Sequence, residues 1–345
     1  MAEKTGIEWT NHTFNIVRGC RKISAGCTNC YAELFAKRNP GTHGTWGANK
    51  VRAFSKPGWE KQFLKWDKEA EKAGEIHNVF VNSMWDPFEG RDEGGKEKRD
   101  GPREDYLPAI HGLFRVADLC PNLRFQMLTK RPWNAVVWWI DVAAVATATG
   151  AVARWPANLQ IGASVEDQAA ADERVKWLVK LPARVRFLSM EPLLGGVQVP
   201  SLDRIQWVIV GGESGSKARP MHPEWVRSIR DQCQSAGVPW FFKQWGEWIP
   251  RSHTGRRHDW HAERTPGGDG WRVPVSEGCR WGALSVDGDF AEGATVWNGH
   301  DDDGPGAEAY MHRLGKENTG RTLDGKVWDG FPPEPQRAQL FGGGR

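Results

Sequence analysis

Three of the six cysteines lie within one eleven-residue segment, as Cys20, Cys27 and Cys30. Their spacing is C-x6-C-x2-C. Cysteines separated by two residues can bind the same metal centre, and the longer gap, which contains Ser24 and Gly26, can wrap a loop around it. Three thiolates match a [4Fe–4S] cluster that keeps one iron open for another ligand. We therefore predict an iron–sulfur cluster on these three cysteines.

The same thiols could fill three of the four positions around a zinc ion, with a histidine such as His12 or His43 as the fourth ligand. Structural zinc sites usually consist of two close ligand pairs, and no second C-x2-C or H-x3-H pair lies near the segment. A redox-active dithiol of Cys27 and Cys30 would leave Cys20 without a role. The spacing therefore favours the cluster over zinc and over a dithiol.

The composition is typical of a globular protein. The chain has 345 residues, 26% of them charged, and a formal net charge of +3, so the whole molecule is not a strongly basic nucleic-acid binder. No apolar run approaches the ~20 residues that cross a bilayer, and the polar N-terminal segment lacks a signal-peptide pattern. We therefore expect a cytoplasmic protein with no membrane partner, where clustered cysteines bind metal more often than they form disulfides.

Short apolar runs alternate with amphipathic segments along the first 250 residues. This alternation predicts parallel βαβ units, and the strands are nearly continuous in apolar character, as in a sheet covered by helices. The predicted strands are Phe14–Arg18, Val79–Asn82, Arg124–Thr129, Leu159–Ser164, Val185–Met190, Trp207–Val210 and Pro239–Lys243. The predicted helices are Tyr31–Arg38, Trp59–Lys72, Arg103–Leu119, Trp133–Val145, Asp167–Leu181 and Pro223–Ala236.

Seven such units predict an α/β fold, a partial or complete parallel (β/α) barrel over residues 1–250, with a doubly wound open sheet as the alternative. After about Pro250 the sequence is rich in Gly, Arg, Asp and His. We expect residues 251–345 to form an irregular extension, with a small β insertion over Arg251–Gly304, that packs on the barrel. The charged, glycine-rich stretch Glu89–Pro102 predicts a mobile loop.

Polar residues follow most of the predicted strands. Function collects at the carboxyl ends of parallel strands, so we expect these residues to form one polar rim around a ligand. Gly211 and Gly212 predict either close approach of the backbone to a ligand or a tight turn. The candidate binding residues are Asn82, Ser83, Lys130, Ser164, Glu166, Glu191, Gly211, Gly212 and Glu213.

The cysteine segment, its place after the first predicted strand and the barrel pattern together resemble the radical S-adenosylmethionine (SAM) superfamily. The usual spacing there is C-x3-C-x2-C, with an aromatic residue before the last cysteine. Here the first gap is six residues, and the aromatic residue, Tyr31, follows the last cysteine. The resemblance implies a [4Fe–4S] cluster and SAM as cofactors, generation of a 5′-deoxyadenosyl radical, and an electron donor such as a flavodoxin or ferredoxin.

The same resemblance implies roles for the rim residues toward SAM and the substrate. A lysine suits a carboxylate or a phosphate, and a carboxylate suits a ribose diol. The resemblance implies that Asn82 and Ser83 contact the amino group of SAM and that Ser164 and Glu166 contact its ribose hydroxyls. Lys130 and Arg131 would pair with the SAM carboxylate or with a substrate phosphate. Glu191 and Glu213 would bind the substrate or orient SAM.

Longer motifs resemble a phage- and bacterium-encoded three-cysteine-motif family of unknown function. They cover most of the chain and include TGIEWT, FLSMEPL, VIVGGESG and FFKQWGEW. The phage association suggests a nucleic acid or nucleotide as the substrate. The alternative is a non-catalytic nucleic-acid- or protein-binding module with a structural zinc on the three cysteines, which would account for the basic residues Arg18, Arg21 and Lys22 and for some of the 20 tryptophans.

Overall fold

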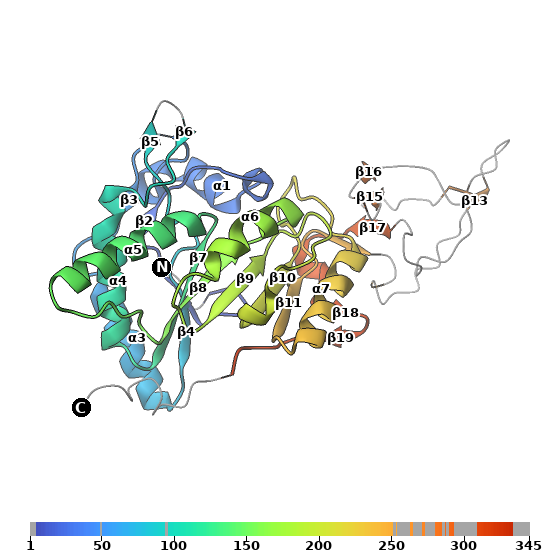
Figure 1. The fold of residues 1–345 in the computed structure, drawn as a ribbon. Coiled ribbons are helices and arrows are strands. Elements are labelled where there is room, and N and C mark those ends of the chain that lie inside the picture. The colour runs from blue at the N-terminus through green and yellow to red at the C-terminus, as the bar shows by residue number, and fades with distance from the viewer. Residues whose placement is uncertain are drawn as a thin grey trace.

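Seven parallel strands form one sheet that curves into a partial barrel (Figure 1). The computed structural model describes residues 5–48, 50–93, 96–250, 253, 263–264, 271–272, 280–284, 287, 290–292 and 309–333. The strands lie side by side in chain order, as in a barrel wall, whereas a doubly wound sheet reverses its order. They are β1 (His12–Thr13), β4 (His77–Phe80), β7 (Leu123–Thr129), β8 (Leu159–Ser164), β9 (Arg186–Met190), β10 (Trp207–Gly211) and β11 (Trp240–Gln244). The predicted partial barrel is confirmed.

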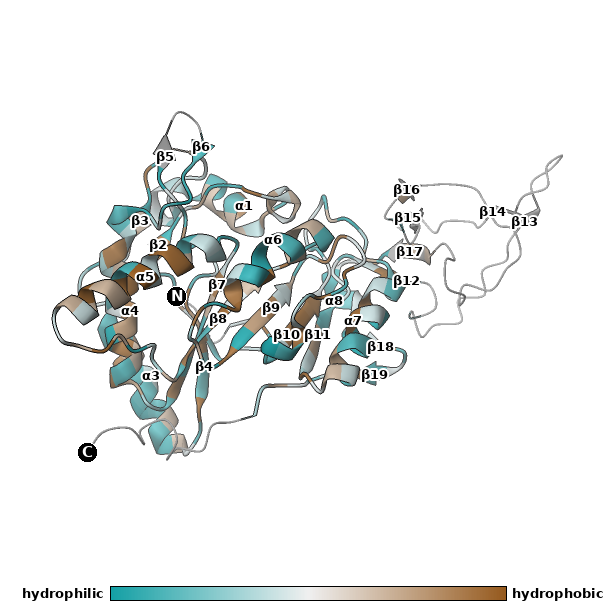
Figure 2. Cartoon of the chain, viewed as in Figure 1, coloured by the Kyte–Doolittle hydropathy of each residue, from teal (hydrophilic) through white to brown (hydrophobic). Residues whose placement is uncertain are grey.

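Helices between the strands cover the outer face of the sheet. Outward side chains such as Val79, Met127 and Val210 pack with these helices in one large apolar core, and the central strands are correspondingly apolar (Figure 2). Burial of this face is the main stabilising contribution to the fold. The helices of this layer are α3 (Glu60–Ala73), α4 (Leu107–Leu119), α5 (Pro132–Ala148), α6 (Gln168–Leu178) and α7 (Pro223–Ala236). The shorter helices of the described residues are α1 (Tyr31–Arg38), α2 (Pro40–His43) and α8 (Lys316–Thr319).

The inner face of the sheet changes from apolar to polar along the strands. Successive side chains of a strand point to opposite faces, so every second residue faces the interior. Near the strand starts, the inward residues Phe80, Phe187, Trp207 and Phe241 form a second apolar cluster with Trp9. Toward the carboxyl ends the inward positions are polar: Asn82, Lys130, Ser164, Ser189, Glu191 and Lys243. The barrel therefore has a closed apolar floor and a polar mouth.

Short strand pairs surround this sheet. Four two-stranded pairs among the described residues are antiparallel, and a further four-stranded antiparallel sheet follows the barrel. The pairs are β2 (Val17–Arg18) with β3 (Ala53–Phe54), β5 (Asp92–Glu93) with β6 (Lys96–Glu97), β13 (Glu263–Arg264) with β14 (Trp271–Arg272), and β18 (Thr322–Leu323) with β19 (Lys326–Val327). The four-stranded sheet consists of β12 (Trp248–Pro250), β17 (Ala309–Arg313), β15 (Arg280–Leu284) and β16 (Phe290–Glu292).

The first predicted strand, Phe14–Arg18, is wrong in its position. The parallel strand β1 ends before this run, and the end of the run forms β2, which pairs with β3 outside the barrel sheet. Asn15 explains the break, because its side-chain oxygen accepts from Met84 N at 2.8 Å and its amide nitrogen donates to Ser83 Oγ at 2.9 Å. These side-chain bonds replace the next ladder bonds and turn the chain away from the sheet.

The stretch predicted as a mobile loop, Glu89–Pro102, folds back as the hairpin of β5 and β6. Glu97, in β6, accepts a hydrogen bond from Gly90 N at 2.9 Å and forms an ion pair with Arg131 at the barrel mouth. The Glu97 side chain is only 11% exposed. The ion pair joins Glu97 to Arg131 at the start of α5, 34 residues away in sequence. Local composition does not reveal such a pairing, so the charged stretch resembled a mobile loop.

Residues after 250 cover one edge of the barrel. Phe242 N, in the edge strand β11, donates to Trp328 O at 2.9 Å. Phe331 packs on the rings of Trp207 and Phe241, with centroids 5.5 and 5.2 Å apart. The C-terminal segment therefore closes the apolar floor from outside. The greater part of the predicted insertion Arg251–Gly304 lies outside the described residues.

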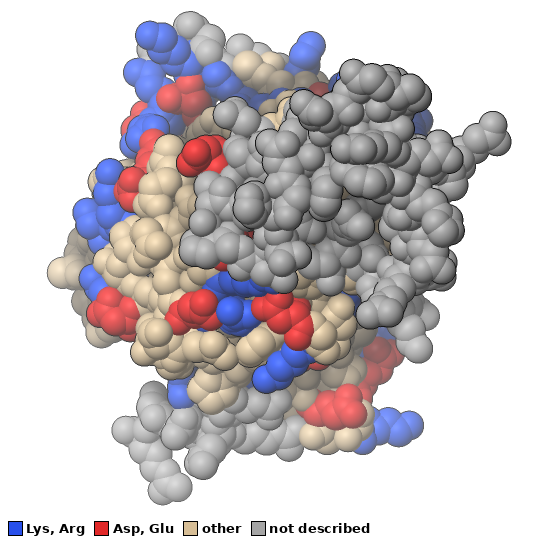
Figure 3. Space-filling model, turned by 90° about the vertical axis from the view of Figure 1, so that its right-hand side faces the viewer, with Lys and Arg blue, Asp and Glu red and all other residues tan. Residues whose placement is uncertain are grey.

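Charges of both signs are interspersed on the face shown in Figure 3, in keeping with the small net charge. No helix among the described residues has the length and apolar character needed to span a bilayer.

Asp324 anchors the C-terminal segment to α7, and its removal is expected to lower stability in a pH-dependent way. Its carboxylate lies 2.7 Å from Arg227 Nη2 and 2.6 Å from Arg230 Nη1. Burial would raise the pKa of Asp324, but hydrogen bonds from the two arginines lower it to about 2, below the ~3.9 of an unfolded chain. Its contribution is therefore complete above about pH 4 and is lost as the pH falls toward 2.

We expect Asp324→Asn to lower the free energy of unfolding at pH 7 by about 1 kcal/mol, because the pairs are partly screened by solvent. Urea unfolding at pH 7 and pH 2.5 measures this, and the difference from the unsubstituted chain should shrink at the lower pH. Asp118→Asn, which breaks an exposed pair with Arg154, is the control. Equal unfolding midpoints at pH 7 for Asp324→Asn and the unsubstituted chain would contradict the expectation.

Candidate functional site

A cavity of about 480 Å³ lies at the mouth of the barrel, where the strands end. Cavities of this size hold small-molecule ligands. All three cysteines of the segment from Cys20 to Cys30, which we call the cysteine segment, lie on its wall, together with most of the predicted binding residues. The predicted residues on the wall are Cys20, Cys27, Cys30, Asn82, Ser83, Lys130, Ser164, Glu191, Gly212 and Glu213.

Glu166, which follows β8, contacts the cysteine segment from behind. Its carboxylate accepts from Gly26 N at 3.3 Å and from Arg174 Nη1 at 2.7 Å, and its side chain is 1% exposed. Burial alone would raise the pKa of Glu166, but the charges of Lys130 and Arg174 and a hydrogen bond from Ser24 lower it to about 2. Glu166 therefore stays ionised and holds the segment in place.

Glu213, which follows β10, holds the same segment at a second point. Its carboxylate accepts from Arg219 Nη2 at 2.6 Å and from Asn29 Nδ2 at 3.1 Å. Asn29 lies between the last two cysteines. Arg219 Nη2 also donates to Ala25 O at 3.1 Å, so a carboxylate and its arginine together fix two parts of the segment.

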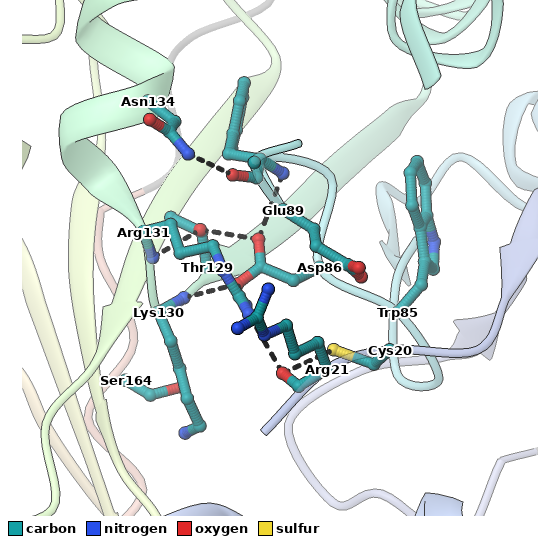
Figure 4. A network of polar contacts seen from close by, with 12 residues as sticks. Cys20, Arg21, Trp85, Asp86, Glu89, Thr129, Lys130, Arg131, Asn134 and Ser164 are labelled. Atoms are coloured by element: carbon teal, nitrogen blue, oxygen red, sulfur yellow. Dashed lines mark hydrogen bonds and ion pairs between the residues drawn. The ribbon is translucent and has the colours of Figure 1, made fainter. Parts of the chain in front are cut away.

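Arg131, at the start of α5, provides a third attachment (Figure 4). Its guanidinium is 1% exposed and lies 2.9 Å from Asp86 Oδ2 and 2.8 Å from Glu97 Oε2. It also donates to Arg21 O at 2.9 Å, next to Cys20. Asp86 is positioned in turn by Thr129 Oγ1 at 2.7 Å. One buried arginine therefore joins the cysteine segment, the β5–β6 hairpin and the loop after β4.

The three cysteines bring three thiols to the wall of the cavity. Cys27 is buried, and Cys20 and Cys30 are partly exposed. Burial raises the pKa of the Cys20 thiol, although the charge of Arg131 opposes it, and burial also raises the pKa of Cys30. Among the described residues, no three Cys, His, Asp or Glu side chains are arranged around a common point as for a metal ion.

The histidines considered as a fourth zinc ligand do not line the cavity. His12 stacks on Trp66 with ring centroids 4.3 Å apart, and its Nε2 lies 3.0 Å from His77 Nδ1. His43 contacts the edge of the Phe35 ring. Both rings pack against other aromatic rings, away from the wall that carries the thiols.

Asn82 and Ser83 make contacts within the chain as well as lining the cavity. Asn82 Oδ1 accepts from Leu128 N at 2.9 Å, and its Nδ2 donates to Trp85 O at 3.1 Å, so this side chain ties the loop after β4 to β7. The backbone oxygen of Ser83 accepts from Tyr31 Oη at 2.9 Å. Tyr31 directly follows the last cysteine, so Ser83 is a further contact to the start of α1.

Gly211, the last residue of β10, and Gly212, which follows it, are explained by contacts within the chain. A Cβ at Gly212 would lie 1.9 Å from Trp245 O, so only glycine permits the two backbones to approach this closely. Gly211 lies beneath Glu191, whose Oε2 would be 3.1 Å from a Cβ at that position. Glu191 also forms an ion pair with Lys243, which lies in β11.

The family of the chain follows from a family model that matches residues 4–332. Its description is "Protein of unknown function (DUF5131)". The chain belongs to this family. The match covers almost the whole chain, and its description names no cofactor, activity or cysteine motif. No curated protein and no solved structure matches the chain.

Sequence reasoning missed the partners that hold the cysteine segment in this family member. Arg174 lies in the middle of α6 and Arg219 in a loop after β10, and both look like ordinary solvent-facing charges in the sequence. Asn29 stands between two cysteines and was not singled out. Each of these residues contacts a glutamate that was predicted to bind a ligand, and no local pattern reveals such a pairing.

We expect Glu213→Gln to loosen the cysteine segment. An amide cannot accept the charge-assisted bonds of Arg219 and the bond of Asn29 together. Loss of about 1.5 kcal/mol in such a contact raises the open population of the segment about 10-fold. The rate of Cys27 modification by a thiol reagent, mapped by mass spectrometry, should rise by that factor. Glu69→Gln, an exposed glutamate of α3, is the control, and an unchanged rate for Glu213→Gln would disprove the role of this anchor.

Proposed function

We propose that this chain is an iron–sulfur enzyme that binds S-adenosylmethionine and acts on a nucleic acid or nucleotide. The observation that carries the proposal is the position of Cys20, Cys27 and Cys30 on the wall of one cavity at the mouth of a parallel partial barrel. Ligands of parallel α/β folds bind at this end of the strands. A cluster on the three thiols would therefore lie directly against a bound ligand.

Cys20, Cys27 and Cys30 would hold the cluster as thiolates. When bound, the cluster and SAM supply one-electron cleavage of a carbon–sulfur bond and thereby a 5′-deoxyadenosyl radical. The electron would come from a donor such as a flavodoxin or ferredoxin. The anchors Glu166 and Glu213 keep the cysteine segment against the barrel, which limits how far the thiols move from the ligand.

The residues of the wall would bind and shield the ligand. Lys130 lines the cavity with its Nζ 3.9 Å from Glu166 Oε2, and it can bind a carboxylate or phosphate on the cavity side. Ser164 offers a hydroxyl on the neighbouring strand. The apolar floor of Trp9 and Phe80 keeps water from the inner end of the cavity, which protects a reactive species.

The aromatic side chains of the wall support a substrate that contains a nucleobase. Bases stack on aromatic rings in sites that tolerate many sequences, and cationic side chains attract the phosphates. The basic wall residues are Arg21, Lys22, Lys130, Arg131, Lys243 and Lys316, and the aromatic ones are Trp9, Tyr31, Trp46, Phe80 and Trp85.

Iron and sulfide analysis of anaerobically prepared protein tests the cluster. We expect about four iron and four sulfide per chain and a brown colour, because thiolate-ligated iron absorbs visible light. Cys27→Ala should lower both contents to less than about a quarter, since three protein ligands are needed for a site-differentiated cluster. Cys120→Ala, which removes a buried thiol away from the cavity, should keep the iron. A colourless protein with one zinc per chain would refute the proposal in favour of the binding module.

Reductive cleavage of SAM tests the enzymatic part. With dithionite as reductant, the loaded protein should release 5′-deoxyadenosine from SAM. Lys130→Met should raise the KM for SAM about 10-fold without changing the iron content, because one charge-assisted bond to the ligand is lost. No 5′-deoxyadenosine, together with oligonucleotide binding that weakens steeply with salt, would instead indicate a non-catalytic nucleic-acid-binding module.

A further inference from the structure

The ion pair of Glu191 and Lys243 crosses the inner face of β10. Glu191 follows β9 and Lys243 lies in β11, and β10 runs between these strands. Glu191 Oε2 is 2.6 Å from Lys243 Nζ. The inward position of β10 beneath the carboxylate is Gly211, where a Cβ would lie 3.1 Å from Glu191 Oε2. The absence of a side chain at 211 therefore allows the two charges to meet across an intervening strand.

This pair faces the cavity rather than the packed core. Glu191 and Lys243 both line the cavity, with side chains 13% and 16% exposed. Ser189 Oγ lies 3.5 Å from Glu191 Oε1. Partly buried ion pairs add little stability compared with apolar side chains of similar volume. A pair kept in the interior beside a ligand-sized cavity is better explained by recognition than by stability.

The pair presents a hydrogen-bond acceptor next to a donor. The Glu191 carboxylate accepts from an N–H group, and the Lys243 ammonium donates to a carbonyl oxygen. A lactam edge, an N–H beside a C=O in a planar ring, matches this arrangement. Guanine, uracil and thymine have such an edge. Adenine and cytosine reverse this order, because they present an amino group where a lactam has its carbonyl oxygen and an unprotonated nitrogen where it has its N–H. In the orientation of a bound lactam base, they would place a donor against Lys243 and an acceptor against Glu191.

We propose that Glu191 and Lys243 recognise the lactam edge of a guanine, uracil or thymine base in the substrate, with the ring stacked on the aromatic wall of the cavity. This inference rests on the part of the proposed function that gives the substrate a nucleobase. It does not depend on the cluster, because neither residue touches the cysteine segment in any contact described above.

Equilibrium dialysis of the full-length protein with GMP, UMP, AMP and CMP tests this recognition. GMP and UMP should bind at least 10-fold more tightly than AMP and CMP, because a site built to hydrogen-bond one edge rejects a base that leaves its groups unpaired. Glu191→Gln and Lys243→Met should each weaken GMP binding at least 10-fold. Lys243→Arg keeps a donor and should retain more of the GMP binding than Lys243→Met does.

Controls separate recognition from folding. Lys65 and Glu69 form another lysine–glutamate pair, 3.6 Å apart on the exposed side of α3, so Lys65→Met and Glu69→Gln should leave GMP binding unchanged. Gly211→Ala places a methyl group under Glu191 and should weaken GMP binding while the thermal unfolding midpoint stays within a few degrees. A variant whose midpoint falls further is replaced by Glu191→Gln, which keeps the shape of the side chain.

The inference is overturned if all four nucleotides bind equally or if none of them binds. It is also overturned if Glu191→Gln binds GMP as tightly as the unsubstituted chain does. Iron and sulfide analysis of the same preparation tests the cluster separately. Selective binding of GMP and UMP by protein that contains no iron would reject the proposed cluster and support the base recognition. Iron and sulfide in protein that binds the four nucleotides equally would support the cluster and reject the base recognition.

Discussion

The position of the cysteine segment depends on buried charges at the ends of three strands. The segment has only one short turn of regular structure, over Ala25–Cys27, so backbone ladders cannot hold it against the barrel. Arg131, Glu166 and Glu213 hold it instead, through partners 110, 140 and 184 residues away in sequence. Because these contacts span the whole first 220 residues, the segment can be ordered only when the barrel wall is complete.

Each of these buried charges is shared between the barrel and the segment. Glu166 has Arg174 as its partner, and Glu213 has Arg219, so each ion pair is largely neutralised within the barrel before the segment adds a hydrogen bond. Leaving one member of such a pair alone would cost several kcal/mol, because an uncompensated charge would remain buried. The cysteine segment adds hydrogen bonds from the Gly26 N–H and the Asn29 side-chain amide to these ion pairs of the barrel. Loss of a segment contact would therefore leave the ion pair of each glutamate with its arginine intact.

The barrel itself was readable in the sequence, whereas the contacts at its mouth were not. The strands β7 and β8 stand within one residue of their predicted bounds, because each is an apolar run that ends at a polar residue facing the mouth. The prediction failed at Asn15, where side-chain hydrogen bonds end the sheet inside an apolar run, and at Glu97, where a charged residue is buried by an arginine from another element. The local sequence pattern shows how apolar a segment is. It does not show that Arg131 pairs with Glu97, 34 residues away, or that Glu166 bonds to Gly26, 140 residues away.

The polar rim predicted from the strand ends divides into two groups that sequence cannot separate. The side chains of Glu166, Glu213 and Asn82 form hydrogen bonds with other residues of the chain. Lys130 and the pair of Glu191 with Lys243 keep their charges on the cavity side. The two glutamates of the first group lie beside the cysteine segment, whereas Lys130, Glu191 and Lys243 project from the inner face of the sheet. Asn82 also faces inward, but its amide bonds to the backbone of Leu128 and Trp85. The sequence signal of the second group is Gly211, in the strand that lies between Glu191 and Lys243. Its lack of a side chain leaves room for these two side chains to meet across β10. Inward-facing residues at the carboxyl ends of β7, β9 and β11 therefore present their charges to the cavity, and the neighbouring carboxylates of Glu166 and Glu213 contact the cysteine segment.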